Sequence, residues 1–415
     1  MLRYATIPIR SKGPQETMNK LSQLLCAILL LVVSQSILAV ETPKPEKFIS
    51  VADIHFDPFV ECEKSPKPCL VIKKLRNANP QDWEHIFEKY GHQQMVQYGQ
   101  DTNYFLLKST LNTLQKVNQK EHPHFVMLLG DFLGHDFREK YVEYSGDTTH
   151  AGVQAFIKKT MQFLTLEINK VFPNIDVYPA IGNNDSYSED YMVIPNGAFF
   201  QDTKTTWSGF IKNKANQESF NRSFGTSGYY VITLANHPDK KIIILNTVLF
   251  STKVKGQGAK QTAQTQLQWL RKQLSIAQKN HQKVILAFHI PADINVSGAF
   301  ENNFGVIWKF WAPAYWKELK KISIQYADTI TVILPAHIHR DIFQFIILGS
   351  FSKIPVNFTP AISPIFGNDP GFKVFSYDLP GFDITNVDTY FNNLSAGEKN
   401  NWEIGYSVHV PHLVA

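Results

Sequence analysis

Apolar residues recur at two spacings along this chain, one typical of buried strands and the other typical of helices. Short unbroken apolar runs predict strands at 48–52, 125–129, 177–181, 284–288 and 330–334. Apolar positions three and four residues apart predict helices over 103–119, 152–170 and 262–279. In the first half of the chain, the predicted strands alternate with the predicted helices.

The second half of the chain is richer in strands. Two apolar runs, 229–234 and 241–245, flank the polar residues 236–240 and predict a hairpin. Two further runs predict strands at 342–347 and 372–377. Strands that alternate with helices, followed by consecutive strands, predict an α/β fold. We expect a four-layer α-β-β-α sandwich, in which two mixed sheets pack face to face with helices outside.

The first 39 residues have the pattern of a secretory signal peptide. Lys20 precedes the apolar run 24–33, and Ala39 precedes a polar stretch. This run is shorter than the roughly 20 residues that span a bilayer, so we expect cleavage, and no transmembrane segment in the mature chain. An uncleaved membrane anchor is the alternative. Met18 is an alternative start, because the residues before it add nothing that a signal needs. The expected location is secreted, periplasmic or lumenal.

The remaining chain is predicted to have a short linker at 40–46, a single catalytic domain at 47–380 and a C-terminal surface extension at 381–415. The formal net charge is +5, and residues 1–40 carry four basic side chains against one acidic side chain. The rest of the chain is therefore nearly neutral. This balance gives no reason to expect bulk binding of nucleic acid.

Two of the three cysteines remain after removal of a signal peptide. Cys62 and Cys69 have six residues between them in a proline-rich segment, whereas Cys26 lies in the signal region. A close pair in an exported protein favours a disulfide. A metal site at this pair is disfavoured, because the spacing is wide and no second pair exists.

Five short segments that carry metal-ligand side chains lie at or just beyond the ends of predicted strands. They are Asp53-Ile-His55, Gly130-Asp131, Gly182-Asn183-Asn184-Asp185, His289 and His337-Ile-His339. Proteins of the α/β class build their sites at the carboxyl ends of strands, so we expect the five segments to meet. Each segment alone also fits an ordinary structural role, such as a helix cap at Asp131 or a core histidine at His289.

The residue types in these segments suit two divalent cations. Residues two apart in an extended chain project to the same side, so the two ligands of Asp53-Ile-His55 can reach one ion. A carboxylate such as Asp131 can bridge two cations about 3.5–4 Å apart. Asn183 offers a neutral oxygen that keeps the charge of the site moderate. Together the segments predict a dinuclear site, and its expected chemistry is phosphate ester hydrolysis.

The order of these motifs resembles that of the calcineurin-like metallophosphoesterase superfamily. The context is similar to acid sphingomyelinase and the acid-sphingomyelinase-like phosphodiesterases, through residues 130–136, 178–183, 289–291, 336–343 and 363–372. The resemblance covers residues 47–380 and implies the fold of that superfamily, which agrees with the sandwich expected from the strand pattern.

The resemblance also implies a ligand set, position by position. Asp53, His55 and His339 would hold one metal. Asn183, His289 and His337 would hold the other, and Asp131 would bridge the two. Zinc is the metal favoured by this imidazole-rich set, with iron and manganese as alternatives.

The chain departs from the family pattern at Asn184. Most members have a histidine there that is assigned to protonation of the leaving group, whereas the Gly-Asn-Asn-Asp spelling is similar to that of vacuolar endopolyphosphatases. We therefore expect His135 to be the general acid and Asp136 to orient its ring. A purely structural hydrogen bond is the alternative role for His135.

These observations predict an exported phosphoesterase that cleaves phosphodiester or phosphoanhydride bonds by attack of a metal-bridged hydroxide. The expected substrate is a soluble phosphodiester, a nucleotide, polyphosphate or a lipid head group. The saposin-like domain of acid sphingomyelinase has no counterpart here, which disfavours bulk sphingomyelin. The alternative function is an exported metal-binding protein whose catalysis has lapsed. Only Asn184 supports that alternative, and the full set of seven ligands argues against it.

Overall fold

The computed structural model describes residues 44–410, apart from 64, 296–306, 348–352 and 397–400. The expected signal peptide, residues 1–39, lies outside the described residues, as does the start of the expected linker. Among the described residues, no helix is both long and apolar enough to cross a membrane.

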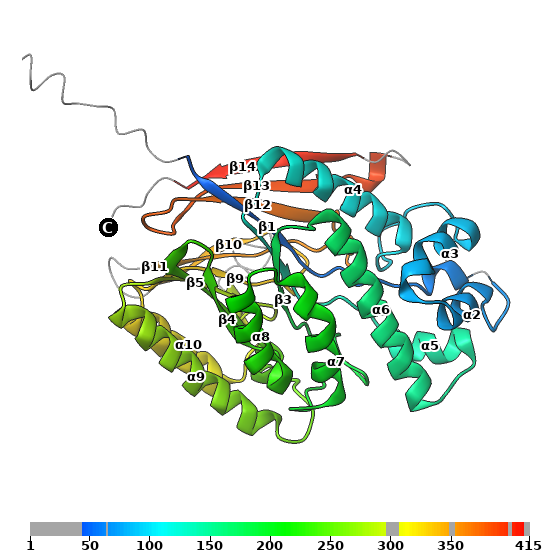
Figure 1. The fold of residues 1–415 in the computed structure, drawn as a ribbon, viewed down its shortest axis with the longest axis horizontal. Coiled ribbons are helices and arrows are strands. Elements are labelled where there is room, and N and C mark those ends of the chain that lie inside the picture. Colours follow the sequence, from blue (N-terminus) through cyan, green and yellow to red (C-terminus); the bar gives the residue numbers. More distant parts are fainter. Residues whose placement is uncertain (1–43, 64, 296–306, 348–352, 397–400, 411–415) are drawn as a thin grey trace, which may run out of the picture. The chain divides into compact units, whose positions relative to one another are not determined.

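The first sheet has six strands in the order β14-β13-β12-β1-β2-β3 (Figure 1). Their bounds are β1 Glu46–Val51, β2 Phe125–Leu129, β3 Asp176–Ala180, β12 Gly371–Tyr377, β13 Ile384–Asn392 and β14 Trp402–His409. Strands β1, β2 and β3 pair in parallel, and the other three add on as antiparallel strands. Every residue of β2 is buried, as its continuous apolar run predicts.

The second sheet also has six strands, in the order β10-β11-β9-β6-β5-β4. Their bounds are β4 Tyr230–Leu234, β5 His237–Leu245, β6 Lys283–Phe288, β9 Ile330–Leu334, β10 Phe343–Ile347 and β11 Lys353–Asn357. Strands β5, β6, β9 and β11 are parallel, and β4 and β10 are antiparallel edge strands. A small ribbon of β7 (Asp293–Asn295) and β8 (Ile307–Lys309) follows β6.

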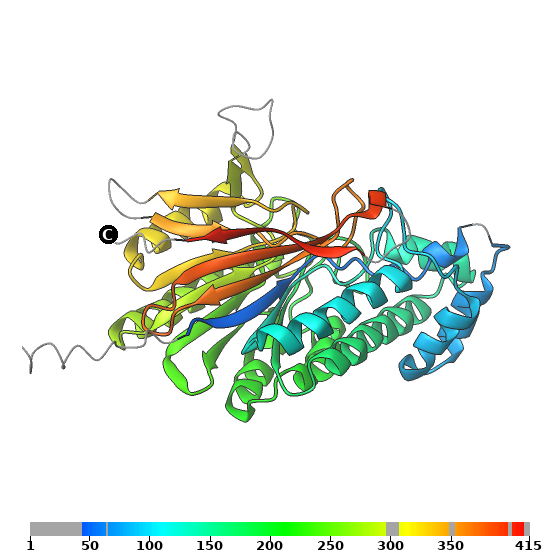
Figure 2. The same ribbon diagram turned by 90° about the horizontal axis from the view of Figure 1, so that it is seen from above.

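Helices cover the outer faces of the two sheets, which confirms the four-layer α/β sandwich (Figures 1 and 2). Helices α4 (Tyr104–Glu121) and α6 (His150–Val171) lie side by side at the first sheet, and α9 (Ala259–Lys279) and α10 (Pro313–Gln325) at the second. The remaining helices are α2 Leu70–Asn77, α3 Trp83–Tyr90, α5 Phe137–Ser145, α7 Ala198–Trp207 and α8 Lys214–Ser227.

Local sequence explains where the long helices begin. The side chain of Asn103 accepts a hydrogen bond from the Leu106 amide at the start of α4, and Thr149 accepts one from Gly152 at the start of α6. Such caps satisfy amide groups that the first helical turn leaves unpaired. Pro313 occupies the first turn of α10, where its missing N–H group costs nothing.

Two segments differ from the expectation. The hairpin of β4 and β5 turns earlier than expected, because β5 begins at His237 and includes most of the polar stretch 236–240. Residues 384–392 and 402–409, expected to lie in a surface extension, form β13 and β14 and continue the first sheet. The alternation of apolar and polar residues in β13 is weak because polar residues such as Asn386 and Asp388 interrupt it. The strand conformation of this segment therefore depends on its pairing with β12.

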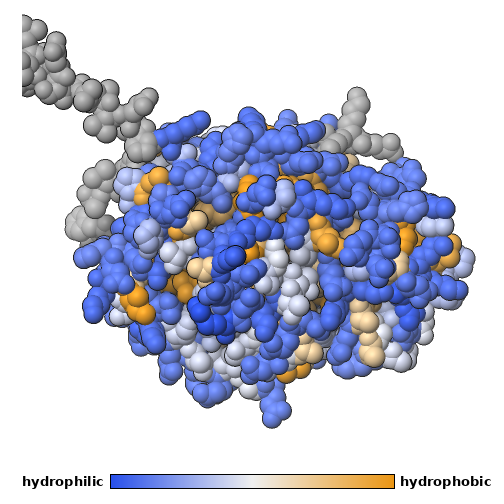
Figure 3. All heavy atoms as spheres, in the orientation of Figure 1, coloured by the Kyte–Doolittle hydropathy of each residue, from blue (hydrophilic) through white to orange (hydrophobic). Residues whose placement is uncertain are grey.

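The core is continuous and rich in aromatic residues, including Trp83 and Trp207, which are fully buried. The face drawn in Figure 3 is largely hydrophilic, with scattered apolar residues, as is usual for a protein that buries its apolar side chains. A disulfide joins Cys62 to Cys69, as the cysteine count predicts, and it holds the loop before α2.

Candidate metal centre

The five ligand-bearing segments meet because the parallel strands of both sheets end at the same place. In the first sheet, β1, β2 and β3 run in register and lead into Asp53, Asp131 and Asn183. In the second sheet, the adjacent parallel strands β6 and β9 lead into His289 and His337. The carboxyl ends of neighbouring parallel strands lie at one edge of a sheet, and here the two edges face each other.

Asp53, His55 and His339 form the first ligand group. Their ligand atoms lie within 4.8 Å of one another, and all three side chains are buried. His339 Nε2 lies 3.1 Å from His55 Nε2 and 3.5 Å from Asp53 Oδ1. Three ligand atoms that converge at this spacing can surround one cation.

Asp131, His289 and His337 form the second ligand group, and their ligand atoms also lie within 4.8 Å of one another. Asn183 joins them, since its side-chain oxygen lies 3.1 Å from His289 Nε2. The structure therefore brings together all seven side chains that the motifs predict as metal ligands.

Asp131 lies between the two groups. Its Oδ2 atom is 3.4 Å from His55 Nε2 in the first group and 3.1 Å from His289 Nε2 in the second. Its other oxygen, Oδ1, accepts a hydrogen bond of 2.8 Å from the Asn184 amide. One carboxylate oxygen in reach of both groups is the arrangement that a bridging ligand needs.

Backbone carbonyls orient two of the imidazole rings. His289 Nδ1 lies 2.7 Å from the Leu129 carbonyl, and His55 Nδ1 lies 3.1 Å from the Leu133 carbonyl. Because a carbonyl only accepts, each Nδ1 must carry the proton and donate it. In a neutral ring the lone pair then resides on Nε2, the atom that faces the ligand group.

The ligand residues occupy backbone conformations that are uncommon for side chains other than glycine. Asp53, His55, Asp131, His337 and His339 have φ angles of 49°, 43°, 54°, 76° and 55°. Each such residue costs of order 1–3 kcal/mol, and such residues cluster at functional sites. The surrounding strands hold the strained turns in place.

Two glycines permit the close approach of the loops after β2 and β3. A Cβ atom on Gly130, whose φ is +88°, would lie 2.7 Å from the Gly182 nitrogen, and one on Gly182 would lie 2.1 Å from the Asp131 nitrogen. Asp185 then ties the loops together: its carboxylate accepts from the amides of Asp131 at 3.0 Å and Phe132 at 2.8 Å. Sequence reasoning placed Asp185 in a ligand segment but assigned it no role.

Burial and neighbouring charges shift the pKa values of the ligand side chains. It raises the pKa of Asp53 to about 7, against the lowering effect of His289, and it lowers the pKa of His337 to about 3. For Asp131, burial alone would raise the pKa, but His289 and His55 outweigh it and the pKa lies below its ordinary value. Burial also lowers the pKa of His55 to about 4, whereas for His289 the neighbouring charge of Asp131 outweighs burial and raises the pKa to about 9.

These residues fit divalent cations. Asp53 Oδ1 is buried and has no hydrogen-bond partner among the described residues. A buried carboxylate oxygen without a partner is costly unless a cation compensates it. The donor set of imidazoles, carboxylates and one amide oxygen suits zinc, iron and manganese.

His135 lies at the edge of the centre, and Asp101 orients it. The rings of His135 and His55 stack with centroids 4.2 Å apart. His135 Nδ1 lies 3.1 Å from both carboxylate oxygens of Asp101, whose Oδ2 also accepts from the His135 amide at 2.7 Å. Burial lowers the pKa of His135, but the bond to Asp101 and its charge outweigh burial and raise it.

The expected orienting residue, Asp136, is exposed at the start of α5. Asp136 has a left-handed backbone conformation, with φ 54°, and α5 starts directly after it. The partner of the His135 ring is therefore Asp101 rather than Asp136. Asp101 precedes a helix instead of ending a strand, so the strand-end pattern could not have found it.

Asn184 lies beside the first ligand group and is buried. Its side-chain nitrogen lies 3.4 Å from His55 Nδ1, and its oxygen accepts from the side-chain nitrogen of Asn183. An amide group cannot give up a proton near neutral pH. Its position next to the ligands suits orientation of Asn183.

Several known proteins are similar to this chain. A model of the calcineurin-like phosphoesterase family matches residues 47–341. Cyclic GMP-AMP phosphodiesterase SMPDL3A of Bos taurus is 25% identical over 88% of this chain and 76% of its own length. Sphingomyelinase phosphodiesterase D of Dictyostelium discoideum is 26% identical over 88% and 78%. Among solved structures, the calcineurin-like phosphoesterase YfkN of Bacillus subtilis aligns over 88% of this chain and 90% of its own, with 9% identity and a TM-score of 0.37.

The family match spans most of the chain and includes all seven ligand positions, and each of the two relatives aligns over 88% of the chain. The chain therefore belongs to the calcineurin-like phosphoesterase family of hydrolases, in its acid-sphingomyelinase-like branch.

Proposed function

We propose that this protein is an exported phosphodiesterase that works with two divalent cations. The observation that carries the proposal is the position of Asp131, whose Oδ2 atom lies within 3.4 Å of one imidazole from each ligand group. A site for one ion would need only one of the two ligand groups and no carboxylate between them.

The proposed ligands divide between the two ions. Asp53, His55 and His339 would hold one ion, Asn183, His289 and His337 would hold the other, and Asp131 would lie within reach of both. Zinc is the metal that we expect, because imidazole provides four of the seven side chains. Cations bound here would supply Lewis acidity toward the phosphoryl oxygens and the attacking water.

His135 is the proposed general acid. Its ring stacks on His55 and is only part-buried, so its Nε2 atom can reach a leaving group that lies outside the ligands. Asp101 holds Nδ1 and favours the protonated ring. The departing oxygen then takes the proton from Nε2, and a proton from solvent restores the ring. In this scheme Asn184 positions Asn183 and gives no proton.

Export and substrate class form the rest of the proposal. The signal-like pattern in residues 1–39 and the Cys62–Cys69 disulfide both favour an oxidising compartment. The relatives are named for a cyclic dinucleotide and for sphingomyelin as substrates, and what they share is a phosphodiester bond. We therefore propose a phosphodiester as the substrate of this protein.

The test is hydrolysis of bis-p-nitrophenyl phosphate by the purified mature chain, with its metal content measured in the same sample. We expect two metals per chain and turnover that a chelator abolishes and zinc or manganese restores. A chain that holds two metals without turnover would instead support the lapsed metal-binding protein. A panel of phosphodiesters, nucleoside triphosphates, polyphosphate and sphingomyelin would then rank the substrates.

A further inference from the structure

The ring of His339 is held differently from the rings of His55 and His289. Those two rings each donate from Nδ1 to a backbone carbonyl. His339 Nδ1 is buried and has no hydrogen-bond partner among the residues that the structure describes. A ligating histidine is usually oriented through its second nitrogen. The orientation of His339 must therefore come from the backbone turn that carries it and from its ring contact with Phe366, at 4.8 Å between centroids.

The turn that carries His339 comprises residues 337–341 and has a strained backbone. His337 and His339 have φ angles of 76° and 55°, in the left-handed region that side chains other than glycine seldom adopt. Such a conformation persists only where the surrounding structure fixes it. The start of the turn is fixed by the His337 amide, which donates to Asp53 Oδ2 at 3.2 Å. The residue at the other end of the turn is Asp341.

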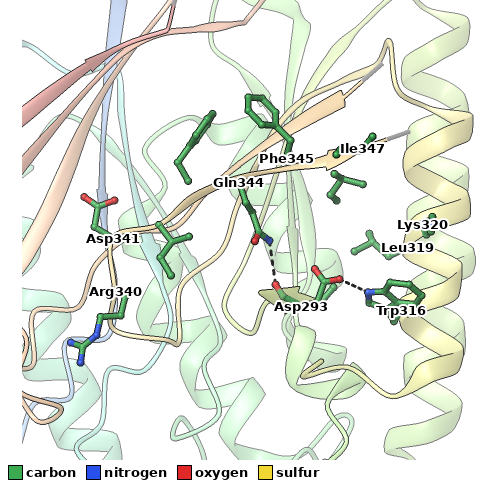
Figure 4. Close-up of a pocket in the computed structure, with 13 residues that line it drawn as sticks. Asp293, Trp316, Leu319, Lys320, Arg340, Asp341, Gln344, Phe345 and Ile347 are labelled. Atoms are coloured by element: carbon green, nitrogen blue, oxygen red, sulfur yellow. Dashed lines mark hydrogen bonds between the residues drawn. The ribbon is translucent and has the colours of Figure 1, made fainter. Parts of the chain in front are cut away.

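The Asp341 end of the turn borders a cavity. Among the described residues, a cavity of about 670 Å³ lies between helix α10 and the edge strand β10, and Arg340 and Asp341 line one end of it. Figure 4 shows the side chains of these two residues pointing in opposite directions. Atoms that face such a space have few contact partners on that side. The bonds of Asp341 on its other side therefore fix the end of the turn.

Three side chains of the first sheet converge on the Asp341 carboxylate. Lys373 of β12 pairs with Oδ1, Thr389 of β13 donates to Oδ2 at 2.7 Å, and Tyr406 of β14 also donates to Oδ2. Thr389 and Tyr406 follow Asp341 by 48 and 65 residues in sequence. They belong to the segment that the sequence predicted as a surface extension, yet they bond to the turn that carries a proposed metal ligand.

These bonds lie where water competes with them little. The Lys373 side chain is 2% exposed, and that of Asp341 is 19% exposed. Lys373 also donates to the side chain of Asn357 in β11, so it is bonded to both sheets. Hydrogen bonds in such poorly hydrated surroundings are stronger than those in water. The two sheets together therefore hold the Asp341 carboxylate in one place.

We infer that Asp341 is a positioning residue for His339, and that Thr389 and Tyr406 act on the metal centre through Asp341. Loss of their bonds would let the turn relax and would move the His339 ring away from the rest of the first ligand group. His337 keeps its own bond to Asp53, so the second ligand group should be little affected. The inference rests on the proposed function in one respect, since it assumes that a cation binds at each ligand group. It does not require turnover.

The test measures zinc binding by the metal-free mature chain, by calorimetric titration with elemental analysis of the product. Asp341→Asn would leave Lys373 buried without its partner charge and could unfold the protein. Tyr406→Phe and Thr389→Val each remove one donor and retain the Lys373–Asp341 pair. We expect each to weaken one of two zinc-binding steps about tenfold, and the double variant to weaken it up to about 100-fold. The other step should stay unchanged.

His339→Ala is the reference for the affected step. This variant lacks the ligand itself, so the zinc-binding step that it loses belongs to the first ligand group. Tyr406→Phe should weaken the same step. Because the ligands remain present in Tyr406→Phe, excess zinc should restore its turnover of bis-p-nitrophenyl phosphate to the wild-type level. Excess zinc should not restore that of His339→Ala.

Tyr377→Phe is the matched control. Tyr377 of β12 donates to Glu46 Oε2 at 2.9 Å. Glu46 begins β1, whereas the metal ligands follow the end of that strand. The variant thus removes a bond of the same kind from the same sheet, at the opposite end of the strands. Urea unfolding of the metal-free chains should show comparable losses in Tyr377→Phe and Tyr406→Phe, but only Tyr406→Phe should bind zinc more weakly.

The outcomes separate this inference from the proposed function. Equal zinc affinities in the wild type, Tyr406→Phe and Thr389→Val would overturn the inference and leave the phosphodiesterase intact. Weakening of one step in these variants, in a wild type that binds two zinc ions without turnover, would support the inference and contradict the hydrolase. Weakening of equal size in Tyr377→Phe would reveal a general effect of the sheet and overturn the inference. A wild type that binds no zinc would overturn both.

Discussion

Lys373 of β12 pairs with Asp341, two residues beyond His339, and so joins the first sheet to the second beside the metal centre. Lys373 is almost fully buried, whereas most lysines are exposed. Thr389 and Tyr406, which follow Lys373 in register across β13 and β14, also donate to Asp341. A cross-strand row of three donors thus converges on one carboxylate.

Replacing Lys373 should destabilise the protein strongly. Lys373→Met leaves Asp341 without its cation in a poorly hydrated place, and we expect a loss of about 3 kcal/mol in the free energy of unfolding. Urea unfolding followed by circular dichroism measures it. Lys255→Met is the control, because Lys255 pairs with Glu189 at an exposed position and should cost less than about 1 kcal/mol. Equal losses in the two variants would contradict a structural role for the Lys373–Asp341 pair.

Asp131→Asn should empty the centre of at least one metal. The amide keeps the shape of the side chain but loses the negative charge that lets Oδ2 serve both ligand groups. We expect fewer than two metals per chain by elemental analysis and a fall in kcat/KM of more than about 100-fold, since even indirect partners of a metal contribute about 10- to 100-fold. Asp239→Asn, a change of an exposed carboxylate, should retain both metals and full activity.

His135→Ala and Asn184→Ala should differ in their effect on kcat. A general acid contributes about 10²- to 10⁴-fold, so the loss of His135 should lower kcat within this range while the metals stay bound. Asn184→Ala removes only an orienting contact and should lower kcat less than about tenfold. If the two losses are reversed, leaving-group protonation must be assigned elsewhere.

The pH profile should report the His135–Asp101 pair. The pKa of His135 lies above its ordinary value of 6.5 because Asp101 outweighs the effect of burial, so the acid stays protonated to a higher pH. We expect kcat to fall as pH rises through this raised pKa. Asp101→Asn removes the charge and should move the fall to lower pH. An unchanged alkaline limb in Asp101→Asn would exclude His135 as the titrating group.

The same pair contributes to stability in a defined pH window. The stability that His135 contributes is fully present below pH 6.5 and is lost as pH rises through the raised pKa of His135. The stability that Asp101 contributes is present above pH 3.8 and is lost as pH falls through the lowered pKa of Asp101. The difference in unfolding free energy between wild type and Asp101→Asn should therefore be largest between these limits.

Removal of metal should lower the stability of the whole domain. The ligands come from both sheets, so ions that bind only the folded chain stabilise it by mass action, by about 2.7 kcal/mol at a free concentration 100 times the dissociation constant. A chelator should lower the melting temperature, and zinc should restore it. A melting temperature that does not respond to either would contradict a metal centre built from both sheets.

The apolar runs of the sequence determined most of the strands and the layer order. Runs such as 125–129 and 330–334 match β2 and β9 residue for residue, because strands buried on both faces need continuous apolar side chains. The apolar pattern did not predict β13 and β14, where polar residues interrupt the strands and pairing with the neighbouring strand determines the structure.

The sequence by itself also determined which side chains gather at the strand ends, because short turns after parallel strands leave little freedom of position. Only the tertiary structure decided their partners. Asp101 reaches His135 from a loop before α4, 34 residues away in sequence, and the cavity under β10 forms where an edge strand meets α10. Such contacts depend on how separate elements pack in three dimensions, and the spacing of residues along the chain does not determine that packing.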